Sequence, residues 1–511
     1  MRMVFLWETT EMKASILTSL ILLLALIAQA SGQGTGTVVI DFLEKEAEEP
    51  LVCRVQIQDA RGRSVRGRGT LFQNGWNLVE NTLTFRGRPG DYRYRAYHGP
   101  QLASANGEFK LDKNSEGYDV VRMPRHANLL EESWYAGDLA ARLAPAQIQK
   151  WMQAEDLQMS AVLQTKVPPG EKSERIVEPE NVGEPWVEDA SYLDDRAGSG
   201  LALHHWLPPA EVPQDLPSTK LLVIAKNNTA PFDLPVHAEI TKLWARDVPI
   251  WLASNRIDSI QVLSTHLTLT GEGGAKFKPF IDPDPGRFRG ALGPGRMIEN
   301  IYWKVLDAGL RIPPSAGSGF GKIDSVLGYN RVYVACAEGT AENWWRGLKA
   351  GNCFVTSGPL LRAKVNGEVP GAVFQAEKEL ELDVALTLTT SDPVSYLDVI
   401  FNGRTLYEAR LNEFAREGGK IPPLKVKESG WLVVRVVTDR NFTYRIATTA
   451  PFYCEVGGEP RVSKAAVEFF ETWLAKAAEQ IGNSSQAQAS ASFINAARKF
   501  WLDRKAIANV P

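Results

Sequence analysis

The chain has little histidine and little cysteine, and it carries no excess of charge of either sign. Its 511 residues include 6 His and 4 Cys, and 57 Lys and Arg stand against 60 Asp and Glu, a formal net charge of −3. A balance this even gives no electrostatic reason to expect a nucleic-acid partner or an anionic membrane surface. No Cys-x-x-Cys pair occurs, which argues against a cysteine-based zinc site.

The four cysteines each lie in an apolar, strand-like run, at Cys53, Cys336, Cys353 and Cys454. In an exported protein four cysteines allow three disulfide pairings. Buried free thiols fit the same apolar surroundings equally well. The sequence leaves both alternatives open.

Long apolar runs are also missing, except near the N-terminus. Lys13 precedes an apolar run at 16–27, and Ala28-Gln29-Ala30 has the small-x-small form of a cleavage site. Residues 1–30 therefore predict a signal peptide, with Met1 or Met12 as the start. The run is short for an uncleaved anchor. We expect a secreted or periplasmic (cell-envelope) protein that meets a membrane only through this peptide.

The length predicts several domains. Residues 37–125 contain short alternating strands separated by turns such as Asn74-Gly75, which indicates a β-sandwich. Its Pro89-Gly90 followed by Asp91-Tyr92 resembles carboxypeptidase-regulatory-like modules. Alternating apolar residues and an Asn402-Gly403 hairpin signal predict a second β-sandwich at 361–456. Two amphipathic helices are expected at 462–508, either packed on the preceding domains as a hairpin or available to a partner.

Between the two sandwiches, residues 128–360 alternate helices with apolar strands, which favours an α/β sheet or barrel. The run at 221–225 predicts a strand covered on both faces, and 257–263 predicts another. A helix is expected at 296–308. Another is expected at 341–350, with Thr340 as N-cap and Gly351 at its end. The stretches 166–195 and 271–295 predict irregular loops.

The α/β region opens with residues 134–166, a strand, a turn, a helix whose first residue is Pro145, and a second strand. Gly137-Asp138-Leu139, followed by a helix that ends in Ala-Glu-Asp-Leu, resembles the first motif of the PHP (polymerase and histidinol phosphatase-like) metallohydrolases, particularly their secreted CehA/McbA-like branch. Further similar runs at 247–253 and 257–259, at 302–318, at 328–334 and at 350–359 extend the resemblance over about residues 130–370.

The resemblance implies a multidomain α/β plus β fold, with a PHP-like distorted (β/α)7 barrel between the N-terminal and C-terminal β-sandwiches and a terminal helical hairpin. It also implies a site for divalent metals. The chain departs from the family motif at three such positions: Ala140 and Arg142 stand where the family has histidines, and Gly319 stands where relatives often have an aspartate. Alanine offers no lone pair and a guanidinium repels a cation.

Five residues remain as candidates for a reduced metal site: His237, Glu239, His266, Asp138 and Asp247. His237 and Glu239 share one side of an extended segment, and His266 follows the strand at 257–263, where the family presents a histidine. The alternative is a cluster of hydrogen-bonded polar residues at strand ends. For His204 and His205, strand alternation predicts that at most one faces the site.

Two functions follow from these expectations. The first is a secreted, PHP-like barrel protein with a degenerate metal site, a non-catalytic or weakly catalytic binding or scaffold protein for an extracellular small molecule or carbohydrate. The second is a hydrolase of phosphoesters, esters or amides with one divalent metal (Zn or Mn), in which Glu239 or Asp138 activates water. Five tryptophans of the region could line a ligand site, although core packing is the usual role: Trp134, Trp206, Trp244, Trp251 and Trp303.

Overall fold

The structure is a computed structural model that describes residues 34–166, 184–209, 211–227, 234–271, 277–416 and 418–511. The predicted signal peptide lies outside these residues. The chain divides into two compact units, one of Met1–Leu51, Val55–Ala96 and Ala105–Met123 and one of Val52–Arg54, Tyr97–Ser104 and Pro124–Pro511. The fold is multidomain α/β plus β with sandwich-like parts.

The first unit consists of two sheets that pack face to face. Ring contacts join them, with Phe85 and Tyr92 centroids 4.9 Å apart and Phe42 and Tyr94 centroids 6.3 Å apart. Asn74 and Gly75 have φ values of 50° and 80°, as the predicted hairpin turn requires. One sheet has β1 (Gly36–Glu44) between β6 (Thr82–Gly87) and β9 (Glu116–Met123), and the other contains β4 (Leu71–Gln73), β5 (Trp76–Val79), β2 (Cys53–Asp59), β7 (Gly90–Tyr97), β8 (Ala105–Leu111) and β3 (Ser64–Val65).

The second unit is built on a long sheet in which one set of strands lies in chain order. All of these strands except β13 run in one direction. The strands of the set are β10 (Trp134–Ala141), β11 (Met159–Gln164), β12 (Trp186–Asp194), β13 (Leu201–His204), β14 (His237–Ile240), β15 (Ser259–Leu263) and β16 (Pro314–Ala316).

The set curls so that the chain after β16 returns to β10. The Ser318 amide donates to the Asp138 carboxylate at 2.9 Å, and the Arg142 amide donates to the Phe320 carbonyl at 2.8 Å. At Gly317 an added Cβ would lie 2.4 Å from the Cβ of Ala140, so only glycine allows this approach. The curled set encloses an interior lined by its own side chains.

The sheet continues on the other side of β10 into the C-terminal β region, so it crosses the predicted boundary at residue 360. A buried core that includes Leu361, Val399 and Val434 separates the layers of this region. Two strands, β17 (Arg331–Ala335) and β18 (Cys353–Thr356), connect β10 to the strands of the C-terminal β region within the long sheet. The strands of that region in this sheet are β27 (Ile446–Thr449), β26 (Gly430–Thr438), β23 (Val394–Phe401), β24 (Arg404–Ala409), β28 (Phe452–Val456) and β20 (Val373–Ala376). Two further pairs are β19 (Leu360–Val365) with β22 (Val384–Thr389), and β21 (Leu380–Leu382) with β25 (Leu424–Val426).

Most of the predicted helices are confirmed. Pro145 begins α2 (Pro145–Glu155), and α5 (Gly293–Asp307) covers the expected region. Thr340 accepts a hydrogen bond from the Asn343 amide and caps α6 (Ala341–Ala350), which Gly351 ends at φ 80°. A short helix, α7 (Leu411–Arg416), lies in the C-terminal β region.

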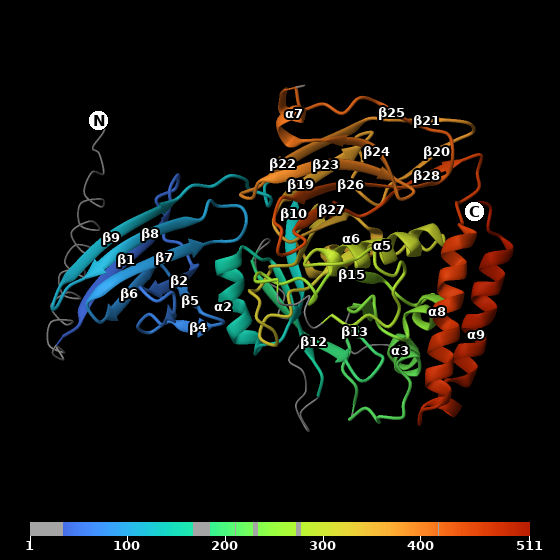
Figure 1. The fold of residues 1–511 in the computed structure, drawn as a ribbon, viewed down its shortest axis with the longest axis horizontal. Coiled ribbons are helices and arrows are strands. Elements are labelled where there is room, and N and C mark those ends of the chain that lie inside the picture. The colour runs from blue at the N-terminus through green and yellow to red at the C-terminus, as the bar shows by residue number, and fades with distance from the viewer. Residues whose placement is uncertain (1–33, 167–183, 210, 228–233, 272–276, 417) are drawn as a thin grey trace, which may run out of the picture. The chain divides into compact units, whose positions relative to one another are not determined.

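The two C-terminal helices, α8 (Lys464–Gly482) and α9 (Ala487–Ala506), lie side by side as a hairpin (Figure 1). The hairpin packs on the α/β region. The Trp501 indole donates to the Pro249 carbonyl in α4 (Val248–Ala253) at 3.0 Å, and its ring stacks on Phe470. Packing on the preceding domains, the first of the two alternatives, is therefore confirmed.

Two of the secondary-structure predictions are wrong. The run at 221–225 belongs to a helix, α3 (Ser218–Asn227), in which Leu221, Leu222 and Ala225 are buried and Ile224 is 42% exposed. This is helical spacing within an apolar run. The stretch 166–195, expected to be irregular, contains the buried strand β12.

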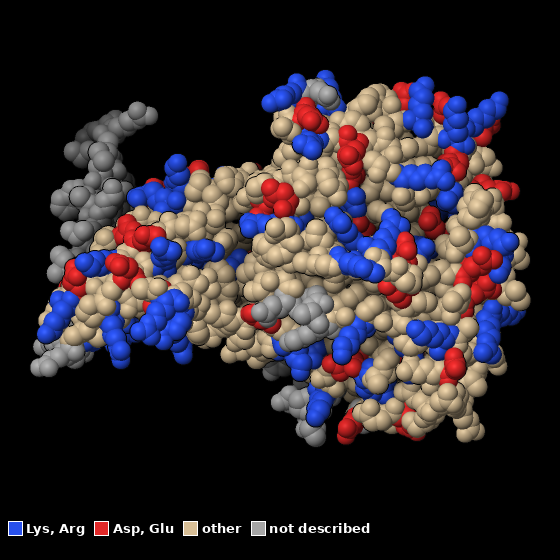
Figure 2. Space-filling model, viewed as in Figure 1, with Lys and Arg blue, Asp and Glu red and all other residues tan. Residues whose placement is uncertain are grey.

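The four cysteines are free, and Cys53, Cys353 and Cys454 are buried. Burial raises the pKa of Cys336 to about 11 and of Cys454 to about 12. No helix among the described residues is long and apolar enough to span a membrane. Lys and Arg side chains are interspersed with Asp and Glu over the face shown in Figure 2.

Candidate functional site

The interior of the curled set is polar although it is closed to solvent. Glu188 (β12), Glu239 (β14) and Gln261 (β15) each expose 0% of their surface, and so does Asp138 (β10), which lies where the chain after β16 meets β10. Buried carboxylates and amides are stable only with hydrogen-bond partners. The pattern of these partners therefore shows what the interior can hold.

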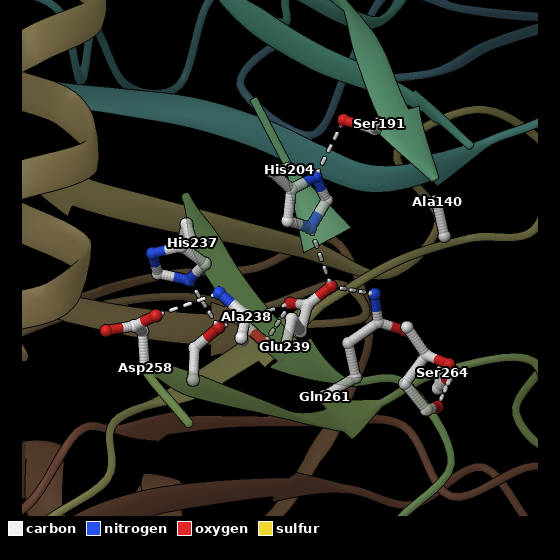
Figure 3. Close-up of polar contacts among 12 residues, drawn as sticks. Ala140, Ser191, His204, His237, Ala238, Glu239, Asp258, Gln261 and Ser264 are labelled. Atoms are coloured by element: carbon white, nitrogen blue, oxygen red, sulfur yellow. Dashed lines mark hydrogen bonds and ion pairs between the residues drawn. The ribbon is translucent and has the colours of Figure 1, made fainter. Parts of the chain in front are cut away.

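Glu239 is the centre of this network (Figure 3). Its carboxylate accepts a hydrogen bond from the Gln261 amide at 2.7 Å and from the Ser315 hydroxyl. His204 Nε2 lies 3.3 Å from the same carboxylate, and the Ser259 hydroxyl lies 3.5 Å from it. In the neutral ring, Nε2–H donates to Glu239 and Nδ1 accepts from the Ser191 hydroxyl at 2.9 Å. Glu239 is surrounded by donors.

Asp138 is satisfied in the same way. Its carboxylate accepts from the backbone amides of Ala140 at 3.0 Å, Ser318 at 2.9 Å and Gly328 at 2.7 Å, and from the Ser318 hydroxyl. Burial raises the pKa of Asp138, and these hydrogen bonds oppose the rise. Asp138 joins the end of β10 to the chain after β16 and has no oxygen without a donor.

His237 lies beside the Glu239 network, and its Nε2 is 2.8 Å from the Ser259 hydroxyl. Its ring packs against Trp345 of α6, with centroids 4.8 Å apart. Burial lowers the pKa of His237 well below its usual range, so the ring is neutral. The structure brings together two of the predicted candidates, His237 and Glu239, through Ser259.

The other two candidates lie elsewhere. Asp247 pairs with the guanidinium of its neighbour Arg246, at 2.7 Å and 3.2 Å. His266 is fully buried against Trp244 and Phe277, with ring centroids 5.2 Å and 5.8 Å away, and neither ring nitrogen has a hydrogen-bond partner. Burial lowers its pKa to about 3. The five candidates do not converge on one point.

The expectation that His204 and His205 point to opposite faces is wrong. His205 has φ 61°, which breaks the strand alternation, and both rings contact Trp345, at 5.0 Å and 4.7 Å. His205 Nδ1 donates to the Pro235 carbonyl at 2.9 Å. Its Nε2 faces Glu188 at 3.4 Å. Burial lowers the pKa of His205 to about 4 and raises the pKa of Glu188 to about 8, so both groups are neutral at pH 7.

The residues present do not fit the metal centre that the resemblance implies. Within the described ranges, no group of three or more His, Cys, Asp or Glu side chains is arranged to hold a metal ion. The oxygens of Glu239 and Asp138 that a cation would use already accept hydrogen bonds. The Gln261 amide directs N–H groups at Glu239, and an N–H group cannot coordinate a cation.

Sequence reasoning missed Glu188, Gln261, Ser315 and Trp345. The first lies in β12, where inward polar residues conceal the strand pattern. Gln261 and Ser315 lie in segments that were recognised, but their inward direction follows only from the register of β14, β15 and β16. Trp345 was identified as part of a helix, and no sequence signal connects it to three histidines.

Of the tryptophans expected near a ligand site, Trp134, Trp206 and Trp251 are buried, while Trp244 and Trp303 are partly exposed. Trp303 lies over Trp431, with ring centroids 5.9 Å apart. Trp244 alone contacts a site candidate, His266. The others have packing roles.

Neither protein-family models nor curated proteins match the chain. Among solved structures, the Bacillus anthracis TIE protein is similar at 15% identity over 22% of this chain and 20% of that chain, with a TM-score of 0.15. Fibronectin(III)-like modules of Clostridium thermocellum CbhA are similar at 10% identity over 18% of this chain and 97% of that chain, with a TM-score of 0.12. Parabacteroides merdae β-glucuronidase is similar at 8% identity over 80% of this chain and 61% of that chain, with a TM-score of 0.15. Likeness this low carries no argument about function.

Proposed function

We propose that the chain is a secreted or periplasmic PHP-like barrel protein whose metal site has degenerated, and that it acts by binding a ligand rather than by hydrolysis. The chain-order arrangement of β10 to β16 and the contacts that bring the chain after β16 back to β10 support a barrel. The resemblance of residues 134–166 to the first PHP motif supports the family.

The observation that carries the proposal is the hydrogen bonding of Glu239. Its oxygens accept from Gln261 and Ser315 and face His204 and Ser259. Oxygens that already accept hydrogen bonds from an amide and a hydroxyl have fewer lone pairs to offer a cation. Ala140 and Arg142 fit the same interpretation, because neither can coordinate a metal.

The first test is the metal content of the purified protein. We expect less than stoichiometric zinc or manganese by elemental analysis, and no hydrolysis of phosphoester, ester or amide substrates. Restoring two family ligands in one variant, Ala140→His with Arg142→His, should increase zinc uptake relative to the parent, because imidazole nitrogens then replace a methyl group and a guanidinium. Gly319 is left unchanged, because it has φ 69° and an added Cβ there would lie 2.8 Å from Thr265 Cγ2.

The hydrolase alternative predicts a different result. Stoichiometric metal that is lost in His237→Ala and in His266→Ala, but retained in His98→Ala, would overturn the proposal. His98 is a suitable control because its Nδ1 bonds to the Val52 carbonyl at 2.7 Å, away from Glu239. Circular dichroism and thermal melting of each variant would separate loss of metal from loss of fold.

A further inference from the structure

Two cationic side chains lie at the edge of the curled set where its parallel strands end. Arg142 directly follows β10, and Lys242 follows β14 by two residues. The two strands run in the same direction within the set, so their carboxyl ends lie at one edge. In open and closed α/β sheets this edge is where ligands bind.

These cations are held in place and are only partly neutralised. Arg142 is 13% exposed, and its guanidinium lies 4.0 Å from the carboxylate of Asp195, which follows β12 and is 41% exposed. The Lys242 ammonium makes no hydrogen bond or ion pair within the described residues. The neighbouring carboxylate, that of Asp194, already accepts hydrogen bonds from the Arg196 guanidinium at 2.7 Å and 2.8 Å. Two partly buried cations therefore share one exposed carboxylate.

Electrostatics support the closeness of the two cations. Burial lowers the pKa of Lys242, and the positive charge of Arg142 lowers this pKa further. The negative charge of Asp195 raises the pKa of Lys242 and so opposes both effects. Burial also lowers the pKa of Arg142, against the charge of Asp195. A cation removed from water without full pairing is costly, and an anionic group would relieve that cost.

The backbone around the cations is fixed by close contacts. The stem of Lys242 lies on Gly200, where an added Cβ would be 2.5 Å from the Lys242 Cβ. Gly321 lies against Leu143 and the Arg142 carbonyl carbon, 2.7 Å and 3.1 Å from an added Cβ. The stem of Lys242 is therefore packed against backbone, and the backbone at Arg142 is closely packed against Gly321.

A second observation at the same edge points to a ligand. His266 follows β15, is 3% exposed, and has two ring nitrogens without a hydrogen-bond partner. Trp244, two residues after Lys242, packs edge-on against this ring at 5.2 Å. Thr265 Cγ2 would lie 2.8 Å from a Cβ added at Gly319. The next residue, Phe320, accepts a hydrogen bond from the Arg142 amide, so the segment after β15 adjoins the segment that bonds to Arg142. His266 is thus a buried imidazole without a hydrogen-bond partner in the segment that follows β15, at the same edge of the set as Arg142 and Lys242.

We propose that this edge binds a small ligand bearing an oxyanion, with Arg142 and Lys242 pairing with its carboxylate or phosphate oxygens. The His266 imidazole would bond to a further ligand oxygen, and the partly exposed Trp244 would pack against an apolar face. The inference rests on the proposed binding function and makes it more specific: the family's place for metal cations has become a place for an anion.

The experiment is calorimetric titration of the full chain with inorganic phosphate, with D-galacturonate and, as the uncharged match, with D-galactose. We expect binding of one or both anions, at least tenfold weaker in Arg142→Gln and in Lys242→Gln and nearly unchanged in Lys242→Arg. Lys499→Gln, on the exposed face of α9, is the control for loss of one positive charge. His266→Phe, which keeps the ring but loses both nitrogens, should weaken binding severalfold.

The pattern of binding identifies the source of the oxyanion. Binding of galacturonate but not phosphate indicates a sugar acid, and the converse indicates a phosphorylated ligand. Binding of galactose as tight as that of galacturonate, equal binding in the Gln variants, or no binding of either anion would overturn the inference. Elemental analysis of the same samples separates the two proposals, since metal lost in His237→Ala and His266→Ala would overturn the proposed function whatever the anions do.

Discussion

At the scale of single residues, the interior works by keeping its charges neutral or fully hydrogen-bonded. The pair of Glu188 and His205 is the clearest case. His205 Nδ1 donates to the Pro235 carbonyl, which leaves Nε2 as an acceptor facing Glu188 at 3.4 Å. A protonated Glu188 can present its hydroxyl to that nitrogen, while its other oxygen accepts from the Ala190 amide at 2.8 Å. The protonated acid is therefore the form that suits the site.

This arrangement predicts a loss of stability as pH rises. Burial raises the pKa of Glu188 from 4.5 to about 8 in the folded protein, so the folded state binds more protons than the unfolded state between these values. His205, lowered from 6.5 to about 4, acts in the opposite sense only below pH 6.5. Between pH 6.5 and 8, Glu188 should therefore reduce the free energy of unfolding by up to about 1.4 kcal/mol per pH unit.

Glu188→Gln removes the titrating group and keeps an oxygen acceptor and an N–H donor. Its free energy of unfolding, measured with denaturant at pH 6.5 and pH 8, should fall less than that of the parent chain over this interval. Glu342→Gln, at a 61% exposed carboxylate on α6, is the control for loss of one surface charge. Equal pH slopes in parent and Glu188→Gln would show that Glu188 is ionised in the folded protein.

At the scale of elements, the α8–α9 hairpin depends on one side of α9. Trp501 is 0% exposed, stacks on Phe470 at 4.8 Å and donates to the Pro249 carbonyl, whereas the next residue, Leu502, is 62% exposed. Trp501→Ala should cost about 3 to 5 kcal/mol of unfolding free energy because it leaves a cavity and an unpaired carbonyl. Leu502→Ala should stay within about 0.5 kcal/mol. Thermal and denaturant unfolding measure both; similar losses would contradict the packing.

The same scale shows what the sequence could predict. Local signals were sufficient for α2 and α6, because Pro145, Thr340 and Gly351 define helix ends through their own backbone geometry. They failed for α3, where an apolar run of five residues fits a buried strand and a buried helix equally well. They failed again for β12, because a strand that lines a polar interior lacks the apolar alternation by which strands are recognised.

The candidate site was predicted in part for a related reason. The resemblance pointed to Asp138, His237 and Glu239. The structure places His237 and Glu239 inside the curled set, whereas Asp138 is aligned with Ser160 on the other face of the strands and bonds to the chain after β16. The resemblance could not show that Gln261, Ser315 and Ser318 supply the donors that satisfy the two carboxylates, because those contacts join residues far apart in sequence. His266 was grouped with them by its place after a strand, but its ring turns toward Trp244 and Phe277.

At the scale of the whole molecule, buried ionic contacts connect the α/β region to the C-terminal β region. Arg435 in β26 donates to Glu299 of α5 at 2.6 Å and to Asp398 of β23 at 2.6 Å and 3.0 Å. The Tyr444 hydroxyl also donates to Glu299, at 2.9 Å. The shared sheet and this arginine make the two regions parts of one compact unit, as the division of the chain indicates.

Arg435→Met should therefore destabilise the second unit by about 3 to 5 kcal/mol, because two buried carboxylates lose their cation. Adding Glu299→Gln and Asp398→Asn to Arg435→Met should recover most of this loss, since the cost comes from unpaired charge rather than from the missing side chain. Arg404→Met, at an exposed arginine of β24, is the matched control. Denaturant unfolding followed by tryptophan fluorescence measures all four chains. A loss in Arg435→Met that the two neutralising changes leave in full would show that Arg435 acts through packing and not through its charge.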